Sequence, residues 1–145
     1  MPGKVIRAVQ KRLVNFSSLP SGASQEVILA DRLDVLQWRE LTLQVKVHSN
    51  GIAAAAGTIS INSIAQTLSD DDPGVDFLDR SSVPNVLITS TTPSPGYLTT
   101  IISQVQPVGS VYGLANLLRL VAFGSRTGAG AINAVISVEV SAKHA

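Results

Sequence analysis

The stretch WRELTLQVKVHSNG, residues 38–51, constrains the fold more than any other part of this chain. Apolar and polar residues alternate from Leu41 to Val47, and the alternation stops at the sequence HSNG. A period of two places successive side chains on opposite faces of a β-strand, so we predict a half-buried strand that runs into a turn. The apolar phase slips between Trp38 and Leu41, which predicts a bulge near residues 39–40 or a strand that begins after them.

Most of the chain has the same character. Six further stretches look like strands, namely QEVILA (25–30), GTISINSIAQT (57–67), VLITSTT (86–92), YLTTIISQV (97–105), LLRLVAF (117–123) and AINAVISVEV (131–140). No helical segment of about 10 to 15 residues lies between them, and this disfavours a parallel βαβ arrangement. The sequence therefore predicts an all-β fold, an antiparallel β-sandwich or jelly-roll-like single domain.

Residues 1–22 are ambiguous between two kinds of element. Basic residues are interleaved with apolar ones, and SSLPSGAS (17–24) then breaks any regular structure. At a helical period Ile6, Val9 and Leu13 share a face; at a strand period Val5, Val9 and Leu13 face one way and the bases the other. We predict an N-terminal arm or edge element over 1–22 and the β-sandwich domain over 23–145.

The charge content points to a covered surface. Of 145 residues, 45% are hydrophobic and only 14% are charged, whereas average domains carry about 25% charged residues. A low content of charged residues is expected where other subunits cover part of the surface. The formal net charge of +1 gives no broad field for nucleic acid, so no specific nucleic-acid partner is predicted.

Two absences exclude further classes of protein. The chain has no cysteine, which excludes a disulfide scaffold, thiolate zinc sites and cysteine nucleophiles. The longest apolar run, GIAAAAG, is far shorter than the ~20 residues that cross a bilayer, and the first residues lack the apolar core of a signal peptide. We expect a soluble protein that is made in a cytoplasm and has no membrane partner.

The long polar connection, residues 69–85, is the candidate for a metal. Asp70, Asp72 and Asp76 could offer oxygen ligands to calcium. An EF-hand loop needs glycine at position 6 and glutamate at position 12, and counting from Asp70 these positions hold Val75 and Ser81. A solvated turn is therefore the better interpretation, and we predict no metal and no cofactor.

A second candidate is GSRTGAG, residues 124–130. It lacks the glycine and lysine spacing of a P-loop, and it lacks the third glycine of a dinucleotide fingerprint. We predict instead a long hairpin loop that presents Arg126, whose guanidinium could reach the carboxylate of a neighbouring molecule.

Catalytic constellations are also missing from the sequence. The only imidazoles are His48 and His144, and no Gly-x-Ser-x-Gly motif is present. We predict that the protein is not an enzyme and has no catalytic residues. Trp38, Tyr97 and Tyr112 are the aromatic side chains that could form a carbohydrate platform, which keeps a carbohydrate- or ligand-binding adhesion module as an alternative.

Three stretches together carry a family resemblance: WRELTLQVKVHSNG, LSDDDPGVDF and LLRLVAFGSRTGAGAINAVISVEVSAK. With them the chain resembles the small virion proteins of tailed bacteriophages, especially the capsid decoration (cement) proteins. The resemblance implies a β-sandwich or jelly-roll-like domain that forms a homo-oligomer, with a trimer favoured, and clamps a major capsid protein. It also implies location in the virion after synthesis in the host cytoplasm.

The expected function is therefore structural. We expect the arm to supply the partner contacts Val5, Arg7, Val9 and Leu13, the loop 124–130 to supply Arg126, and the connection 69–85 to set register. A tail-tube or head–tail joining protein is a related alternative, because such proteins extend sheets from one copy to the next along exposed strand edges.

Overall fold

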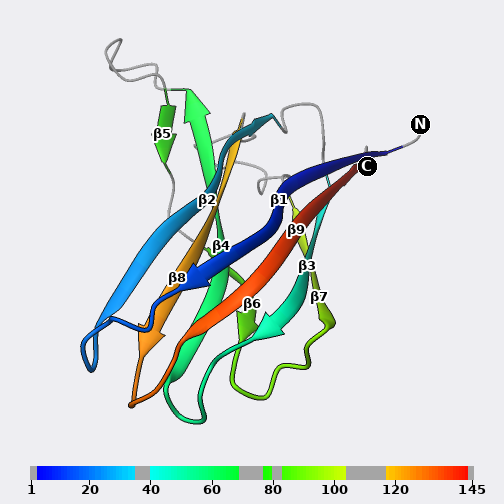
Figure 1. Ribbon diagram of the computed structural model, residues 1–145. Helices are drawn as coiled ribbons and strands as arrows, with labels where there is room; N and C mark the ends of the chain where they lie inside the picture. The colour runs from blue at the N-terminus through cyan, green and yellow to red at the C-terminus, as the bar shows by residue number, and fades with distance from the viewer. Residues whose placement is uncertain (1–2, 35–39, 69–76, 80–82, 104–116, 144–145) are drawn as a thin grey trace.

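The computed structural model describes residues 3–34, 40–68, 77–79, 83–103 and 117–143. The secondary structure of these residues consists of strands, as the alternating pattern predicted (Figure 1). The strands are β1 (Lys4–Asn15), β2 (Ser24–Asp34), β3 (Glu40–Asn50), β4 (Gly57–Leu68), β5 (Phe77–Asp79), β6 (Val83–Ile88), β7 (Gly96–Ser103), β8 (Leu117–Arg126) and β9 (Asn133–Lys143).

The strands form two antiparallel sheets that pack face to face (Figure 1). Sheet A has the order β1-β9-β3-β7, and sheet B has the order β2-β8-β4, with β5 and β6 both paired to the far side of β4. Consecutive strands lie in different sheets throughout the chain, except β4, β5 and β6, which all belong to sheet B. This crossing pattern makes the antiparallel sandwich jelly-roll-like, which confirms the predicted fold class.

The core lies between the central strands of the two sheets. Sheet A contributes the inward-pointing side chains of β3 and β9, which are all fully buried: Leu41, Leu43, Val45, Val47, Ala134, Ile136, Val138 and Val140. Sheet B covers them with Ile59 and Ile61 of β4 and Leu118 and Leu120 of β8. Burying a side chain of this size is worth about 1.5–3 kcal/mol, so a slip of one residue in register would lose most of the core.

The first strand lies in sheet A as an edge strand. It pairs with β9 from Lys4↔Ala142 to Asn15↔Asn133, with register shifts on both sides of Val9. The shifts turn Val9 into the core, at 6% exposure, although Val5 and Leu13 remain outside at 58% each. The predicted common face of these three residues is therefore wrong, because a bulge inserts an unpaired residue and reverses the side-chain phase.

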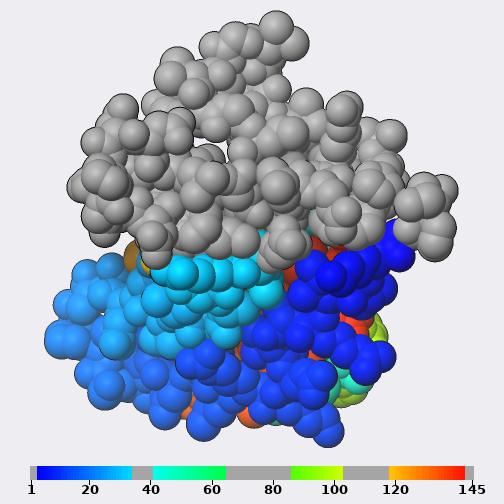
Figure 2. All heavy atoms as spheres, turned by 90° about the horizontal axis from the view of Figure 1, so that it is seen from above, coloured from blue at the N-terminus to red at the C-terminus, as the bar shows by residue number. Residues whose placement is uncertain are grey.

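Residues 3–22 lie along one side of the sandwich, where β1 contacts β2. The Arg12 Nη1 atom donates to the carbonyl oxygens of Ile28 (3.0 Å) and Leu29 (3.3 Å) on β2, and Figure 2 shows the dark blue residues of β1 beside the lighter blue ones of β2. Phe16 is 1% exposed. Its ring occupies the space above Gly124, where an added Cβ would lie 2.2 Å from the ring. The segment thus belongs to the sandwich and is not a free arm.

The connection between β8 and β9 also differs from the expected hairpin. The two strands lie in different sheets, so residues 127–132 form a crossover between the sheets. The amide groups of Thr127 and Gly128 donate to the carbonyl of Ala56, at 2.9 and 3.0 Å, and hold the connection against the residues that precede β4. Strand pairing over long sequence distances decided this, and the local turn signals could not show it.

Several predicted features lie outside the described residues. They are the bulge beside Trp38 and the aspartates Asp70, Asp72 and Asp76 of the polar connection. Within that connection the structure describes β5, which pairs with the end of β4, and the start of β6.

The packing of Phe16 generates a direct test of the edge strand. We predict that Phe16→Ala lowers the free energy of unfolding by about 3–5 kcal/mol, because it opens a cavity between the sheets. Leu13→Ala removes an exposed side chain three residues earlier and should change it by less than about 0.5 kcal/mol. Urea denaturation measures both. Equal, small effects of the two substitutions would contradict the placement of this segment in the sandwich.

Candidate functional site

The outer face of sheet A is an open surface formed by four of the described strands. Its side chains occupy the outward phase of four neighbouring strands: Val5, Arg7 and Leu13 on β1, Val135, Ser137, Glu139 and Ser141 on β9, Thr42, Gln44, Lys46 and His48 on β3, and Tyr97, Thr99 and Ile101 on β7. Strand pairing aligns them in rows, such as Arg7–Glu139–Gln44–Thr99. The face therefore carries regular rows of mostly small or uncharged side chains.

Among the described residues, the outer face of sheet B is open at its sides, where Ile28 of β2 (49%) and Leu87 of β6 (53%) are exposed. The outward phase of its central strands is buried as well, with Ser60 at 8%, Asn62 at 5% and Val121 at 0% exposure. Ser60 donates a hydrogen bond from its hydroxyl to the Asn62 side-chain oxygen. Buried polar groups of this kind are stable only when they find hydrogen-bond partners. The two outer faces thus differ, and in the described part of the chain the more open one belongs to sheet A.

Apolar side chains gather at the two sides of the open face. Val5 and Leu13 are exposed on β1, and Tyr97 (61%) and Ile101 (66%) are exposed on β7. The Lys46 Nζ atom lies 5.5 Å from the centroid of the Tyr97 ring, within range of a cation–π contact. Removing these side chains from water would favour association.

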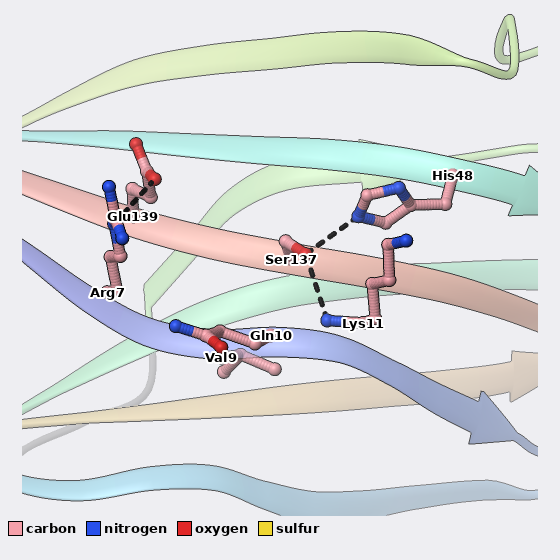
Figure 3. A pocket seen from close by; sticks show the side chains of 7 residues that line it. All are labelled: Arg7, Val9, Gln10, Lys11, His48, Ser137 and Glu139. Atoms are coloured by element: carbon pink, nitrogen blue, oxygen red, sulfur yellow. Dashed lines mark hydrogen bonds and ion pairs between the residues drawn. The ribbon is translucent and has the colours of Figure 1, made fainter.

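A shallow groove of about 470 Å³ crosses this face between β1, β9 and β3 (Figure 3). Its lining residues are Arg7, Val9, Gln10, Lys11, His48, Ser137 and Glu139. At one end the Arg7 Nε atom lies 3.7 Å from Glu139 Oε1, an exposed ion pair of the kind that contributes little to stability. At the other end Ser137 lies between His48 and Lys11.

The bulge in β1 explains the polar end of the groove. Lys11 has a backbone φ of 40°, and its amide is turned to donate to the Ser137 hydroxyl at 2.9 Å. The same hydroxyl lies 2.7 Å from His48 Nε2. Because the oxygen already accepts from Lys11, its own hydrogen can be donated to the imidazole. Ser137 thus accepts a hydrogen bond from the Lys11 amide, which the bulge has turned away from the regular pairing between β1 and β9.

The charge state of His48 is set by its surroundings. Loss of solvent lowers the pKa of the imidazole from its usual 6.5, and the positive charges of Lys46 and Lys11 lower it further. His48 is therefore neutral at physiological pH, which matches its role as acceptor from Ser137. The groove offers the cationic side chains of Arg7 and Lys11 and the side-chain amide of Gln10 as donors to a partner's oxygen atoms.

Among the described residues, the contacts of the serine–histidine pair do not include the further parts of a nucleophilic site. Such sites also need preorganised donors aimed at the developing oxyanion. Here the nearby Lys11 amide is aimed at the serine oxygen itself. No group of three potential metal-ligating side chains occurs among the described residues.

Arg126 lies inside the molecule, at 7% exposure. Its guanidinium donates to the carbonyl oxygens of Gly128, Ser17 (2.7 Å) and Gly130 (3.0 Å), and its Nε has no partner. These bonds tie the β8–β9 crossover to the β1–β2 connection. The predicted presentation at an exposed loop tip is therefore wrong; charged hydrogen bonds to carbonyls hold the side chain inward.

The predicted partner contacts divide into two groups. Val5, Arg7 and Leu13 lie on the outer face of sheet A, whereas Val9 and Arg126 are buried. Contact with a partner remains a prediction for all of them. Sequence reasoning missed Ile101, although its two-residue spacing from Thr99 and Tyr97 could have indicated a shared outward face. Trp38, Tyr112 and His144 lie outside the described residues.

Comparisons with known proteins connect this geometry to a fold. No family model and no curated protein matches the chain. Among solved structures, the VP2 protein of an infectious bursal disease virus subviral particle matches 98% of this chain and 32% of its own, with a TM-score of 0.60 and 10% identity. The T13 viral particle of the same virus gives a TM-score of 0.58 and 11% identity, over 98% of this chain and 31% of the other. The chain has a capsid-like fold.

That likeness concerns the fold, and the chain spans about a third of the length of the viral proteins it matches. A xylan-binding module, CBM15, matches 98% of both chains at 14% identity, but its TM-score of 0.44 is too low to establish a shared fold. The part of the chain that the structure describes contains no helix that is long and apolar enough to cross a membrane.

The environment of His48 predicts a pH dependence. The folded pKa is below 6.5, so the unfolded chain binds this proton more readily. The free energy of unfolding should therefore fall as the pH drops below 6.5 toward the folded pKa. NMR titration of the His48 ring should show the low pKa, and Lys46→Gln should raise it. Lys4→Gln is the matched control and should leave it in place. A wild-type value at or above 6.5 would contradict the geometry.

The bonds of Arg126 predict a structural role. Arg126→Lys should lower the free energy of unfolding by about 2 kcal/mol, because a compact ammonium cannot reach all three carbonyls. Arg7→Lys, on the exposed end of the groove, should change it by less than about 0.5 kcal/mol. Thermal and urea unfolding measure both variants, and a neutral Arg126→Lys would show that the guanidinium does not hold the crossover.

Proposed function

We propose that this chain is a structural protein of a virus particle, which associates with its own copies and with a shell through the outer face of sheet A. The observation that carries the proposal is the character of that face. It is open, it exposes large apolar side chains at both sides, and most outward side chains of its central strands β9 and β3 are uncharged. The capsid-like fold supports the same conclusion.

The physical basis is the low free-energy cost of removing water from the side chains of this face. Threonine, serine and glutamine side chains lose less solvation free energy than ionised groups when a partner covers them, and the exposed apolar side chains gain from burial. A stable interface of standard size buries ~1,600 Å² in total. On a lattice, weaker contacts suffice because neighbouring sites raise the effective concentration.

The specific form we propose is a decoration (cement) protein of a tailed bacteriophage, bound as a homo-oligomer, with a trimer favoured, to the major capsid protein. The resemblance noted in the sequence supports this form. In it the protein resides in the virion after synthesis in the host cytoplasm, has no catalytic activity or cofactor, and needs neither specific nucleic acid nor a membrane. A tail-tube or head–tail joining protein is the related alternative, and a closed ring of higher mass would favour it.

A carbohydrate-binding module is the alternative from another class. One observation favours it: the Tyr97 ring is exposed on a flat sheet face beside Lys46. Sugar-binding faces use aromatic rings as stacking platforms. Carbohydrate binding by this chain would raise its melting temperature in a glycan panel, because a ligand that binds only the folded state stabilises it.

Self-association tests the proposal. We predict that the purified chain forms an oligomer and that Val5→Glu with Leu13→Glu raises the dissociation constant at least tenfold, because two charges must then be desolvated. Sedimentation at several concentrations measures this.

The matched control places the same two charges elsewhere, as Ser18→Glu with Ser21→Glu in the exposed β1–β2 connection, and should assemble like the wild type. A chain that stays monomeric at every concentration and melts higher with a glycan would overturn the proposal in favour of the carbohydrate module.

A further inference from the structure

The two sheets end in four edges, and natural sheets protect such edges against pairing with other chains. Bulges, charged side chains, proline and short strand length are the usual devices, because each interrupts the row of free amide and carbonyl groups. The edges here are β1 and β7 in sheet A, and β2 and the pair β5 and β6 in sheet B.

Three of these edges carry such devices. Strand β1 has two register shifts and the basic residues Lys4, Arg7 and Lys11. Strand β2 also has two register shifts, and Arg12 occupies two of its carbonyl oxygens. On the far side of β4, β5 has 3 residues and β6 has 6, including Pro84, which has no amide hydrogen.

Strand β7 lacks all of them. It pairs with β3 from Glu40↔Ser103 to Val47↔Gly96 without a register shift. Its sequence, GYLTTIIS, contains no charged residue and no proline, and four of its eight residues are β-branched. Among the described residues it pairs with β3 alone, and it lies at the outer side of sheet A (Figure 1). A long, regular and apolar edge of this kind is a template for another strand.

We propose that β7 pairs antiparallel with β7 of a second copy of this chain, about a two-fold axis at Thr99. This inference deepens the proposed self-association and rests on it. The seam would join two four-stranded sheets into one continuous sheet, with the order β1-β9-β3-β7 on either side of the axis.

The sequence of β7 is self-complementary in this register. With Thr99 opposite Thr99 of the second copy, Tyr97 of each chain faces Ile101 of the other. Tyr97 and Ile101 have the largest exposed fractions of the exposed large apolar side chains in the described part of the chain, 61% and 66%. Cross-strand pairs of an aromatic and a β-branched side chain are among the favourable ones. The absence of charge removes repulsion between identical strands, which is why the occupant is a second copy.

The seam also fits a lattice. A two-fold contact uses the same patch on both subunits and closes on itself, so a second contact is needed to extend an assembly. The outer face of sheet A supplies that second contact in the proposed function. The side chains at β1 and the strand edge at β7 lie at opposite sides of sheet A, so both contacts can form together.

Single cysteines test the seam, because the chain has none of its own. Directly opposed residues in an antiparallel pair have Cα atoms about 4.5–5.5 Å apart, which lies within the range of about 4.4–6.8 Å that disulfides span. We predict that Thr99→Cys forms a disulfide dimer under mild oxidation at least tenfold faster than Ser141→Cys, an exposed position on the same outer face.

Two further cysteine variants test the proposed register of the seam, in which Tyr97 faces Ile101. Tyr97→Cys and Ile101→Cys should each cross-link slowly alone and should form a heterodimer rapidly when mixed. Circular dichroism checks that every variant is folded. Equal rates for Thr99→Cys and Ser141→Cys would overturn the seam. Rapid homodimers of Tyr97→Cys would overturn the register.

A substitution that needs no cross-link gives a second measurement. Ile101→Lys places a charge on the edge and should weaken dimer formation at least tenfold, whereas Thr91→Lys in the preceding connection should not. If Val5→Glu with Leu13→Glu abolishes assembly and Ile101→Lys does not, the seam fails and the proposed function stands. The reverse result retains the seam and removes the contact through Val5 and Leu13.

Discussion

The packing of the inward side chains of β3 and β9 against β4 and β8 is the constraint on which the rest of the structure depends. These side chains are fully buried, and each strand carries a run of them at every second position. Because a slip of one residue would move the whole set to the outer face, the register of the four central strands is fixed. The same register fixes what stands on the outer face of sheet A, since the intervening residues must point outward.

The outer surface is consequently a product of the core. Thr42, Gln44 and Lys46 project between the buried residues of β3, and their neighbours on β9 and β7 complete the rows. On sheet B the corresponding phase is buried, at Ser60 and Val121 for example. Within the described residues the outer face of sheet A is therefore the more open of the two, and the few charges on it suit a surface that another molecule covers.

The bulges of β1 affect three features at once. They turn Val9 into the core, they turn the Lys11 amide toward Ser137, and they interrupt the edge of sheet A. A strand without them would expose a regular edge on this side as β7 does on the other. Because β1 is interrupted and β7 is regular, sheet A can be extended by another strand at β7 more readily than at β1. It also separates the proposed seam from the proposed outer-face contact.

The local pattern of the chain determined the all-β class, most of the strands and the alternation of core positions, because a period of two survives in any arrangement that buries one face. Sequence reasoning went wrong where long-range pairing decides the outcome. Val9 was assigned to the face of Val5, and Arg126 to an exposed tip. The contact between Lys11 and Ser137 joins residues 126 positions apart. Only the tertiary structure shows where a register shift falls, which sheet receives each strand and which edge stays free, since these depend on contacts between distant segments and not on the residues beside them.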